Sequence, residues 1–305
     1  MHNYVKEKIS HPSLCINALI SSKNRPYVLF VHGGPGLNSV ILEYLIENEK
    51  IFELLNYNII LYDQRGCGRS EKSDEKILHQ DNVNDLHEII QLLIKQKYQI
   101  AGIIGHSYGA KILYDLYQSY HVEIPGIFLA TASSILTPRI NNLLFDLVYL
   151  KNENPSYYQD VLSEFGDFSY ENIWSLTEKL ADVFKENKNR PYFYWVNLEW
   201  QDKVMNLQKQ IGIPMSEDVF TSVRADLYSN KDNYSVDIKN IIKTPTLWIN
   251  GLHDLVMNGA AFLSQETPEQ RLFLKSAHYP HIEESERFCE EANLFFGKSI
   301  KDCAT

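Results

Sequence analysis

Short apolar runs alternate with longer segments of helical periodicity along most of this chain, and this alternation constrains the fold most strongly. Tyr27–His32 and Ile59–Asp63 are compact apolar runs that end in turn residues, as buried parallel strands do. Between Asp81 and Lys97 apolar residues recur every three or four positions, on one face of a helix. Such alternation predicts a mostly parallel sheet covered by helices on both faces. Further strands are expected at Tyr98–Ile104, Ile124–Ala130, Thr246–Asn250 and Arg271–Leu274, and further helices at Ala110–Tyr120 and Glu283–Phe296.

The segment of residues 136–243 interrupts this alternation. It contains three of the four tryptophans and helical stretches such as Asn172–Glu186, but no clear strand–helix repeat. An insertion of this length between two strands of a sheet is more typical of a lid or cap than of a loop. A second helical layer without substrate contact is the alternative. We therefore expect a core of residues 1–135 and 244–305 with a helical cap formed by residues 136–243.

A serine flanked by glycines stands between a predicted strand and a predicted helix. The pentad Gly105-His106-Ser107-Tyr108-Gly109 has the strand–turn–helix context of a nucleophile elbow. In such a turn the backbone passes so close to itself that only small residues fit at the flanking positions, and the central serine stands above the sheet. The pentad alone is also compatible with a glycine-rich loop and a surface serine, so its interpretation depends on the surrounding motifs.

A glycine-rich motif, His32-Gly33-Gly34-Pro35-Gly36, directly follows the first strong strand. Its glycines leave backbone N–H groups free to point at a developing oxyanion, and we expect Gly34 to be one donor. The second donor would be the N–H of Tyr108, the residue after the nucleophile. A phosphate-binding loop is the alternative, but the motif has neither the lysine of a P-loop nor G-x-G-x-x-G spacing.

Two later loops carry a candidate acid and a candidate base. Asp254 follows the predicted strand Thr246–Asn250, at the sheet edge that also holds the elbow, where a carboxylate can orient an imidazole. An aspartate in such a loop can instead form a turn. Two histidines, His278 and His281, follow the last strand, and residue type alone does not separate them as the base.

Serine, aspartate and histidine follow one another along the chain in the order that α/β-hydrolases use, which differs from the chymotrypsin-like and subtilisin-like orders. From about Pro26 onward the chain resembles this family, whose spacing favours His278 over His281. The mechanism implied is a serine hydrolase: His278, oriented by Asp254, takes the proton of Ser107 as it attacks a carbonyl, and water then hydrolyses the acyl-enzyme. This chemistry needs no metal or organic cofactor.

The resemblance narrows to proline iminopeptidases through two motifs, His32–Gly36 and Tyr62-Asp63-Gln64-Arg65-Gly66-Cys67-Gly68-Arg69-Ser70, the latter implied to be a structural turn. In that family cap carboxylates bind the free α-amino group of the substrate, because a buried ammonium needs an anionic partner. By resemblance to the aromatic cap motif, Trp195 and Glu199 would bind substrate, with Asp226 as a second acid. The implied function is an aminopeptidase that releases an N-terminal proline or a small apolar residue.

Two other functions stay open. His106 stands where iminopeptidases commonly have glycine, and the Gly-His-Ser form is widespread among esterases and lipases. Hydrolysis of a carboxylic ester, lactone or thioester is therefore an alternative, and a non-catalytic ligand receptor on the same scaffold is a further one. The alternative for Glu199 and Asp226 is a solvated helix carboxylate.

Charge and composition restrict the partners. The net charge of −10 and the sequence pI of about 5.5 disfavour nucleic acid and anionic membranes, and no run of lysine or arginine supplies a basic patch. We expect a small-molecule or short-peptide substrate for a monomer or a homo-oligomer. The N-terminus has no apolar region typical of a signal peptide, so we expect a cytoplasmic location. The four cysteines have no C-x-x-C spacing, which predicts free thiols without a zinc site.

Overall fold

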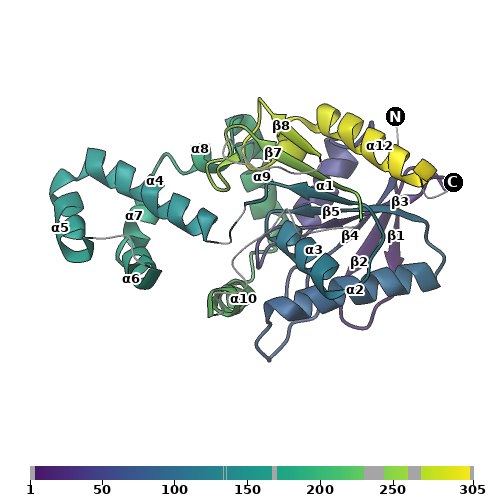
Figure 1. The fold of residues 1–305 in the computed structure, drawn as a ribbon, viewed down its shortest axis with the longest axis horizontal. Helices are drawn as coiled ribbons and strands as arrows, with labels where there is room; N and C mark the ends of the chain where they lie inside the picture. The colour runs from purple at the N-terminus through teal and green to yellow at the C-terminus, as the bar shows by residue number, and fades with distance from the viewer. Residues whose placement is uncertain are drawn as a thin grey trace.

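The computed structural model of this chain describes residues 4–132, 134, 136–166, 170–229, 244–259 and 269–302. Within these residues the framework is one eight-stranded sheet with the strand order β1-β2-β4-β3-β5-β6-β7-β8 (Figure 1). The strands are β1 (Val5–Ile9), β2 (Ile16–Ile20), β3 (Tyr27–Val31), β4 (Asn58–Tyr62), β5 (Ile100–His106), β6 (Gly126–Leu129), β7 (Thr246–Gly251) and β8 (Gln270–Phe273).

The sheet is mostly parallel, which confirms the prediction from the alternating pattern. All neighbouring pairs from β4 to β8 are parallel, whereas β1 pairs with β2, and β2 with β4, in antiparallel orientation. The first two strands were not predicted. Asn17 interrupts the apolar run of β2, yet it is buried because its side-chain amide donates to the carboxylate of Glu43 (3.0 Å). A satisfied polar group of this kind can lie inside a strand at little cost.

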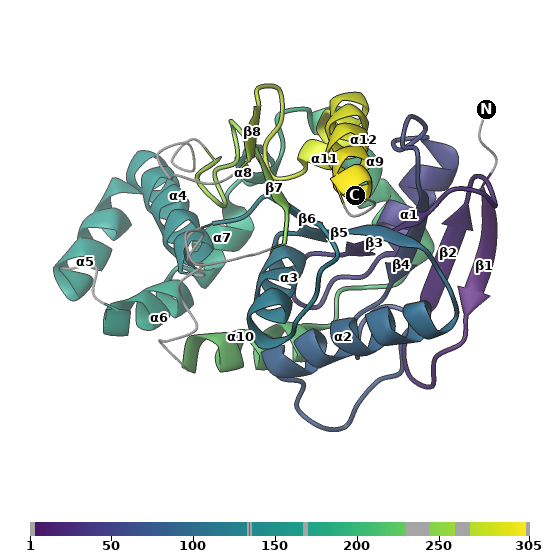
Figure 2. The same cartoon turned by 45° about the vertical axis from the view of Figure 1, so that its right-hand side comes forward.

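Helices cover both faces of the sheet, as expected. On one face lie α2 (His79–Lys95) and α3 (Tyr108–Ser119), and on the other lie α1 (Val40–Asn48) and α12 (Ser285–Asp302) (Figures 1 and 2). The hydrophobic core is accordingly divided into two clusters, one between the sheet and α2–α3 and one between the sheet and α1 and α12. The predicted closing helix Glu283–Phe296 corresponds to α12, and the short helix α11 (Pro280–Glu283) precedes it. None of the helices within the described residues combines the length and apolar composition of a membrane span.

The described residues between β6 and β7 form the helices α4 (Thr137–Glu153), α5 (Pro155–Phe165), α6 (Tyr170–Lys179), α7 (Ala181–Glu186), α8 (Pro191–Tyr194), α9 (Leu198–Ile211) and α10 (Glu217–Ser229). Figure 1 shows α4 to α7 projecting away from the sheet, with their own apolar cluster that includes Leu143, Leu147 and Val161. In contrast, α9 contacts α1 and α10 contacts α2. The helix expected over Asn172–Glu186 is divided into α6 and α7 at Leu180.

Candidate active site

The sharp turn between β5 and α3 holds Ser107 in a strained conformation. Its φ of 55° and ψ of −116° are rarely adopted by a residue with a side chain, and such strain is typical of functional positions. The two flanking glycines are required sterically. A Cβ on Gly109 would lie 2.2 Å from the carbonyl oxygen of Val31, and one on Gly105 would lie 2.7 Å from the carbonyl oxygen of Gly109. The pentad therefore folds as the predicted elbow.

Three loops at the carboxyl ends of parallel strands bring Ser107, Asp254 and His278 together. Nδ1 of His278 donates to Oδ2 of Asp254 (3.1 Å), which leaves Nε2 as the acceptor for the hydroxyl of Ser107 (3.1 Å). Asp254 is 1% exposed and His278 4% exposed, so bulk water competes little for these bonds. A serine linked in this way to a base and an orienting carboxylate can be deprotonated as it attacks an electrophile.

The carboxylate of Asp254 is itself fixed by its loop. Its second oxygen, Oδ1, accepts from the backbone N–H groups of Val256 (2.9 Å) and Met257 (3.0 Å). Each oxygen therefore has its own partners, one on the loop and one on the imidazole. This arrangement fixes the orientation of the ring and places the proton of His278 on Nδ1.

Two further histidines lie beside the base, and among the described residues neither of their side chains hydrogen-bonds to Ser107. His281 lies in an aromatic cluster with Phe30 and Phe52, and burial lowers its pKa to about 3. His106 donates from Nε2 to the carbonyl oxygen of His278 (2.8 Å), while burial and its histidine neighbours lower its pKa well below the ordinary value. A neutral His106 thus supports the backbone of the base. Of the two candidates that follow the last strand, His278 is the one at the serine.

The glycine-rich loop after β3 lies directly against the elbow. A Cβ on Gly33 would be 3.2 Å from Cβ of Ser107 and 3.0 Å from Nδ1 of His106. Gly34 has a φ of 136°, which residues with a side chain rarely adopt. Among the residues that the structure describes, neither the N–H of Gly34 nor that of Tyr108 donates to a protein acceptor. Both groups are available to a ligand atom, as an oxyanion hole requires.

The side chain of Tyr108 is anchored behind the elbow. Its hydroxyl donates to Nδ1 of His79 (3.1 Å) and accepts from the amide of Asn82 (3.1 Å). The other ring nitrogen of His79 donates to Asp115 (2.6 Å), which also accepts from Lys111. These bonds link α2 to the first turn of α3 and so fix the residue that would supply the second N–H.

The insertion forms hydrogen bonds to three loops: the loop that carries Asp254, the loop that carries His278 and the glycine-rich loop after β3. The side-chain amide of Asn141 donates to the carbonyl oxygen of Val256 in the acid loop (2.9 Å). The N–H of Ser216 donates to the carbonyl oxygen of Gly36 in the glycine-rich loop (2.8 Å), and the carbonyl oxygen of Tyr194 accepts from the N–H of His278 (3.0 Å).

The three residues expected to bind substrate lie in different surroundings. Trp195 is buried and stacks on Tyr279 beside the base, with ring centroids 4.1 Å apart. Glu199 is exposed in the first turn of α9, where its own N–H donates to Asn197 (2.9 Å). Asp226, on α10, accepts from the N–H of His79 at the start of α2 (2.8 Å). These contacts bring Trp195 to the histidine loop and bring neither acid there.

Glu283 is a residue of this region that sequence reasoning missed. Its carboxylate holds three backbone N–H groups around the base and the insertion. The only signal in the sequence was its distance of five positions from His278, and a surface helix would give the same pattern.

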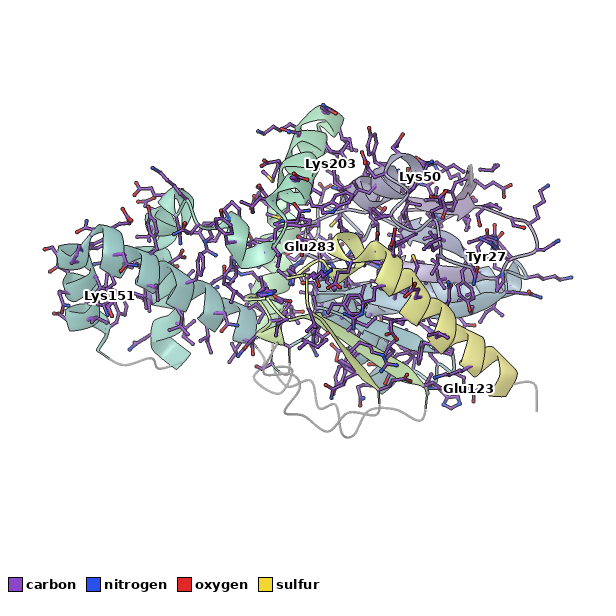
Figure 3. All side chains as sticks on the ribbon, turned by 90° about the horizontal axis from the view of Figure 1, so that it is seen from above. Tyr27, Lys50, Glu123, Lys151, Lys203 and Glu283 are labelled. Carbon is purple, nitrogen blue, oxygen red and sulfur yellow. The ribbon has the colours of Figure 1, made fainter. Side chains whose placement is uncertain are left out.

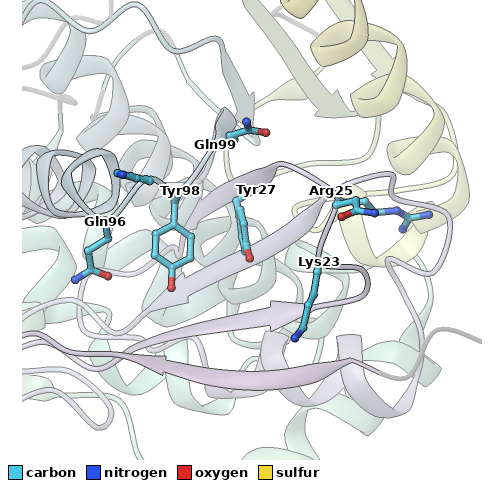
Figure 4. A pocket seen from close by; sticks show the side chains of 8 residues that line it. Lys23, Arg25, Tyr27, Gln96, Tyr98 and Gln99 are labelled. Atoms are coloured by element: carbon cyan, nitrogen blue, oxygen red, sulfur yellow. The ribbon is translucent and has the colours of Figure 1, made fainter.

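A cavity of about 640 Å³ lies far from these residues. It is formed at the amino ends of β3 and β5, whereas Ser107 follows the carboxyl end of β5. Figure 4 shows its lining, which includes Lys23, Arg25, Tyr27, Gln96, Tyr98 and Gln99.

No group of three or more histidine, cysteine or acidic side chains among the described residues could hold a metal ion. Cys15, Cys67 and Cys289 are free thiols, and Cys303 lies outside the described residues.

Comparison with known proteins agrees with this architecture. The family described as the alpha/beta hydrolase fold matches residues 26–285. A proline iminopeptidase of Lactobacillus crispatus is 26% identical over 281 residues, covering 88% of this chain and 89% of the relative. A proline iminopeptidase-related protein of Thermus thermophilus has a similar structure (TM-score 0.65, 16% identity, 97% and 99% coverage). An esterase of Exiguobacterium antarcticum is also similar (TM-score 0.59, 16% identity, 97% and 100% coverage). This chain therefore belongs to the α/β-hydrolase fold family and is a hydrolase.

Proposed function

We propose that this hydrolase acts through an acyl-enzyme on Ser107, with His278 as general base and Asp254 as the carboxylate that orients it. The observation that carries the proposal is the continuous chain of hydrogen bonds from Asp254 through both ring nitrogens of His278 to the serine hydroxyl. His278 takes the serine proton during attack and returns it to the leaving group. The same base then activates water to release the acid.

The N–H groups of Gly34 and Tyr108 would stabilise the negative charge that develops on the carbonyl oxygen. This role is supported by the observation that neither N–H group, beside the elbow, donates to a protein acceptor among the described residues. In such sites each donor contributes about 100- to 1,000-fold to turnover. The proposal assigns no role to a metal or an organic cofactor.

The substrate we propose is a short peptide with an N-terminal proline or small apolar residue. The relatives named proline iminopeptidase support this, since the similarity extends over most of both chains. Trp195, buried beside the base, would contribute to a pocket for the small apolar side chain. Residues 136–243 would act as the cap over this pocket, because their helices contact the acid, base and glycine-rich loops.

A carboxylic ester, lactone or thioester is the second candidate substrate. One observation favours it: the two acids expected to hold a substrate ammonium have other surroundings. Glu199 faces solvent, and Asp226 is engaged by the N–H of His79. An ester substrate without an amino group needs no such acid.

A panel of amino-acid naphthylamides and neutral acyl esters separates the two candidates. We expect prolyl-naphthylamide to be hydrolysed, with activity lost in Ser107→Ala. If Glu199 binds the amine, Glu199→Ala raises KM for the naphthylamide, while Glu217→Ala, at an exposed acid in the first turn of α10, leaves it unchanged. Turnover of esters without naphthylamides would assign the second candidate, and an active Ser107→Ala would contradict the nucleophile.

A further inference from the structure

The link between α8 and α9 forms a short strap, Tyr194–Asn197, across the loop that carries the base. The carbonyl oxygen of Tyr194 accepts from the N–H of His278 (3.0 Å), and the ring of Trp195 stacks on that of Tyr279 with an angle of 15° between them. The strap is part of the insertion, whereas His278 and Tyr279 follow the last strand of the sheet. Two distant parts of the sequence are thus joined beside the base.

Glu283 joins the same two parts through its side-chain carboxylate. Its Oε1 accepts from the N–H groups of Val196 and Asn197 (both 2.8 Å), and its Oε2 accepts from the N–H of Ala277 (2.8 Å). Figure 3 shows Glu283 near the start of the yellow C-terminal helix, between the inserted helices and the sheet. One carboxylate thereby fixes the strap and the residue that immediately precedes the base.

We infer that Glu283 is a positioning residue for the base, holding His278 against Ser107 by tying the histidine loop to the strap. This inference rests on the proposed function of His278. Two adjacent N–H groups of the histidine loop are bound from different sides. The N–H of Ala277 donates to Glu283, and the N–H of His278 donates to the strap, which is itself bound by Glu283. The loop therefore has little freedom to rotate the imidazole away from the serine.

The bonds suit this task because hydrogen bonds from N–H groups to an ionised carboxylate are roughly twice as strong as neutral ones. The distance between His278 and Ser107 is 3.1 Å, and proton transfer requires heavy atoms about 2.6–3.2 Å apart. A displacement of the base by about 1 Å would cost roughly 100-fold in rate. Loss of the carboxylate would thus reduce turnover without removing any group that touches the substrate.

The neighbouring Glu284 provides a matched control. It also accepts from a backbone N–H of this loop, that of Lys275 (2.8 Å), and it lies beside Glu283 in the sequence. Lys275 is three positions before the base, and the hydrogen bonds to the strap are made by Glu283. Glu284→Ala therefore shows what the loss of a loop carboxylate without bonds to the strap does to labelling.

The test compares the wild type with Glu283→Ala, Glu283→Gln and Glu284→Ala, using the fluorophosphonate labelling rate, kcat, KM and Tm. We expect Glu283→Ala to reduce labelling and kcat by about 10- to 100-fold with KM nearly unchanged. Glu283→Gln keeps one oxygen for the strap but turns its NH₂ group towards the N–H of Ala277, so we expect a smaller loss of kcat than in Glu283→Ala, with a modest fall in Tm. Glu284→Ala should label at the wild-type rate.

Wild-type labelling rates in both Glu283 variants, or an equal loss in Glu284→Ala, would overturn the inference. If Glu283→Ala does not fold, Glu283→Gln decides: labelling slower than in the wild type supports the positioning role, and labelling at the wild-type rate contradicts it. A wild-type chain that never labels would instead refute the proposed function, so the two failures are distinguishable.

Discussion

At the residue scale, the two oxygens of Asp254 have separate tasks. One accepts from the backbone of its own loop and the other from the imidazole of His278. This division explains why an aspartate is suited to the position. It satisfies the loop, and it keeps the proton of the histidine on the nitrogen that faces away from Ser107.

Replacing Asp254 by asparagine tests this division. The amide oxygen can keep the bonds to Val256 and Met257, so the NH₂ group faces His278 and requires Nδ1 to be an acceptor. The proton then lies on Nε2, where the ring cannot accept from Ser107. We expect kcat to fall about 10³- to 10⁴-fold in Asp254→Asn with little change in Tm. Near-wild-type turnover on the best substrate of the panel would contradict the assigned role.

The sequence predicted the place of a residue in the site where neighbouring residues in the chain determine it, and not where distant segments do. Ser107 and Gly34 lie in motifs that define their own turns, so their positions could be inferred from spacing. The choice between His278 and His281 needed family spacing, because the aromatic cluster around His281 comes from three separate elements. The surroundings of Glu199 and Asp226 depend on how helices of the insertion pack, which no local pattern encodes.

At the element scale, the parallel strands and the helices α2, α3 and α12 were predictable because each is a continuous periodic segment, whereas α1 was not predicted. The strands β3 to β8 all correspond to predicted runs, with small shifts at their ends. The antiparallel β1 and β2 were missed for physical reasons. In β1 four of five residues are exposed, and in β2 the polar Asn17 is buried through its bond to Glu43.

The helices of the insertion were predicted less well than those of the sheet layers. The apolar side chains of α4–α7 pack in a cluster of their own, whereas those of α9 and α10 join the two core clusters, so no common apolar pattern marks the insertion. Beyond Tyr194, the last residue of α8, the strap is irregular backbone whose conformation depends on Glu283 and His278. Contacts of this long-range kind leave no periodic signal in the sequence.

At the scale of the whole molecule, the core buries several neutral histidines around the candidate site. Burial lowers the pKa of His32, His106 and His281, the last to about 3. In the unfolded chain a histidine titrates near 6.5. Below that pH the unfolded state binds protons that the folded state does not, so the free energy of unfolding falls as pH decreases from about 6.5 towards 3.

His281→Leu should reduce this loss of stability in acid. Below pH 6.5 the free energy of unfolding rises with pH, and removing one buried histidine decreases the slope of this dependence by about 1.4 kcal/mol per pH unit. Urea unfolding of both proteins between pH 4 and pH 7 measures the slope. His121→Leu, at a highly exposed histidine, should retain the wild-type slope. Parallel curves for His281→Leu and the wild type would show that His281 is protonated in the folded state.

Covalent labelling is the sharpest check on the claim that Ser107 is the nucleophile. The wild-type protein is treated with a fluorophosphonate, and the modified peptide is located by mass spectrometry, with Ser107→Ala as the matched control. We predict a single adduct on Ser107 that is absent from Ser107→Ala. A wild-type protein that stays unmodified, or an adduct on another residue that persists in Ser107→Ala, would contradict the claim.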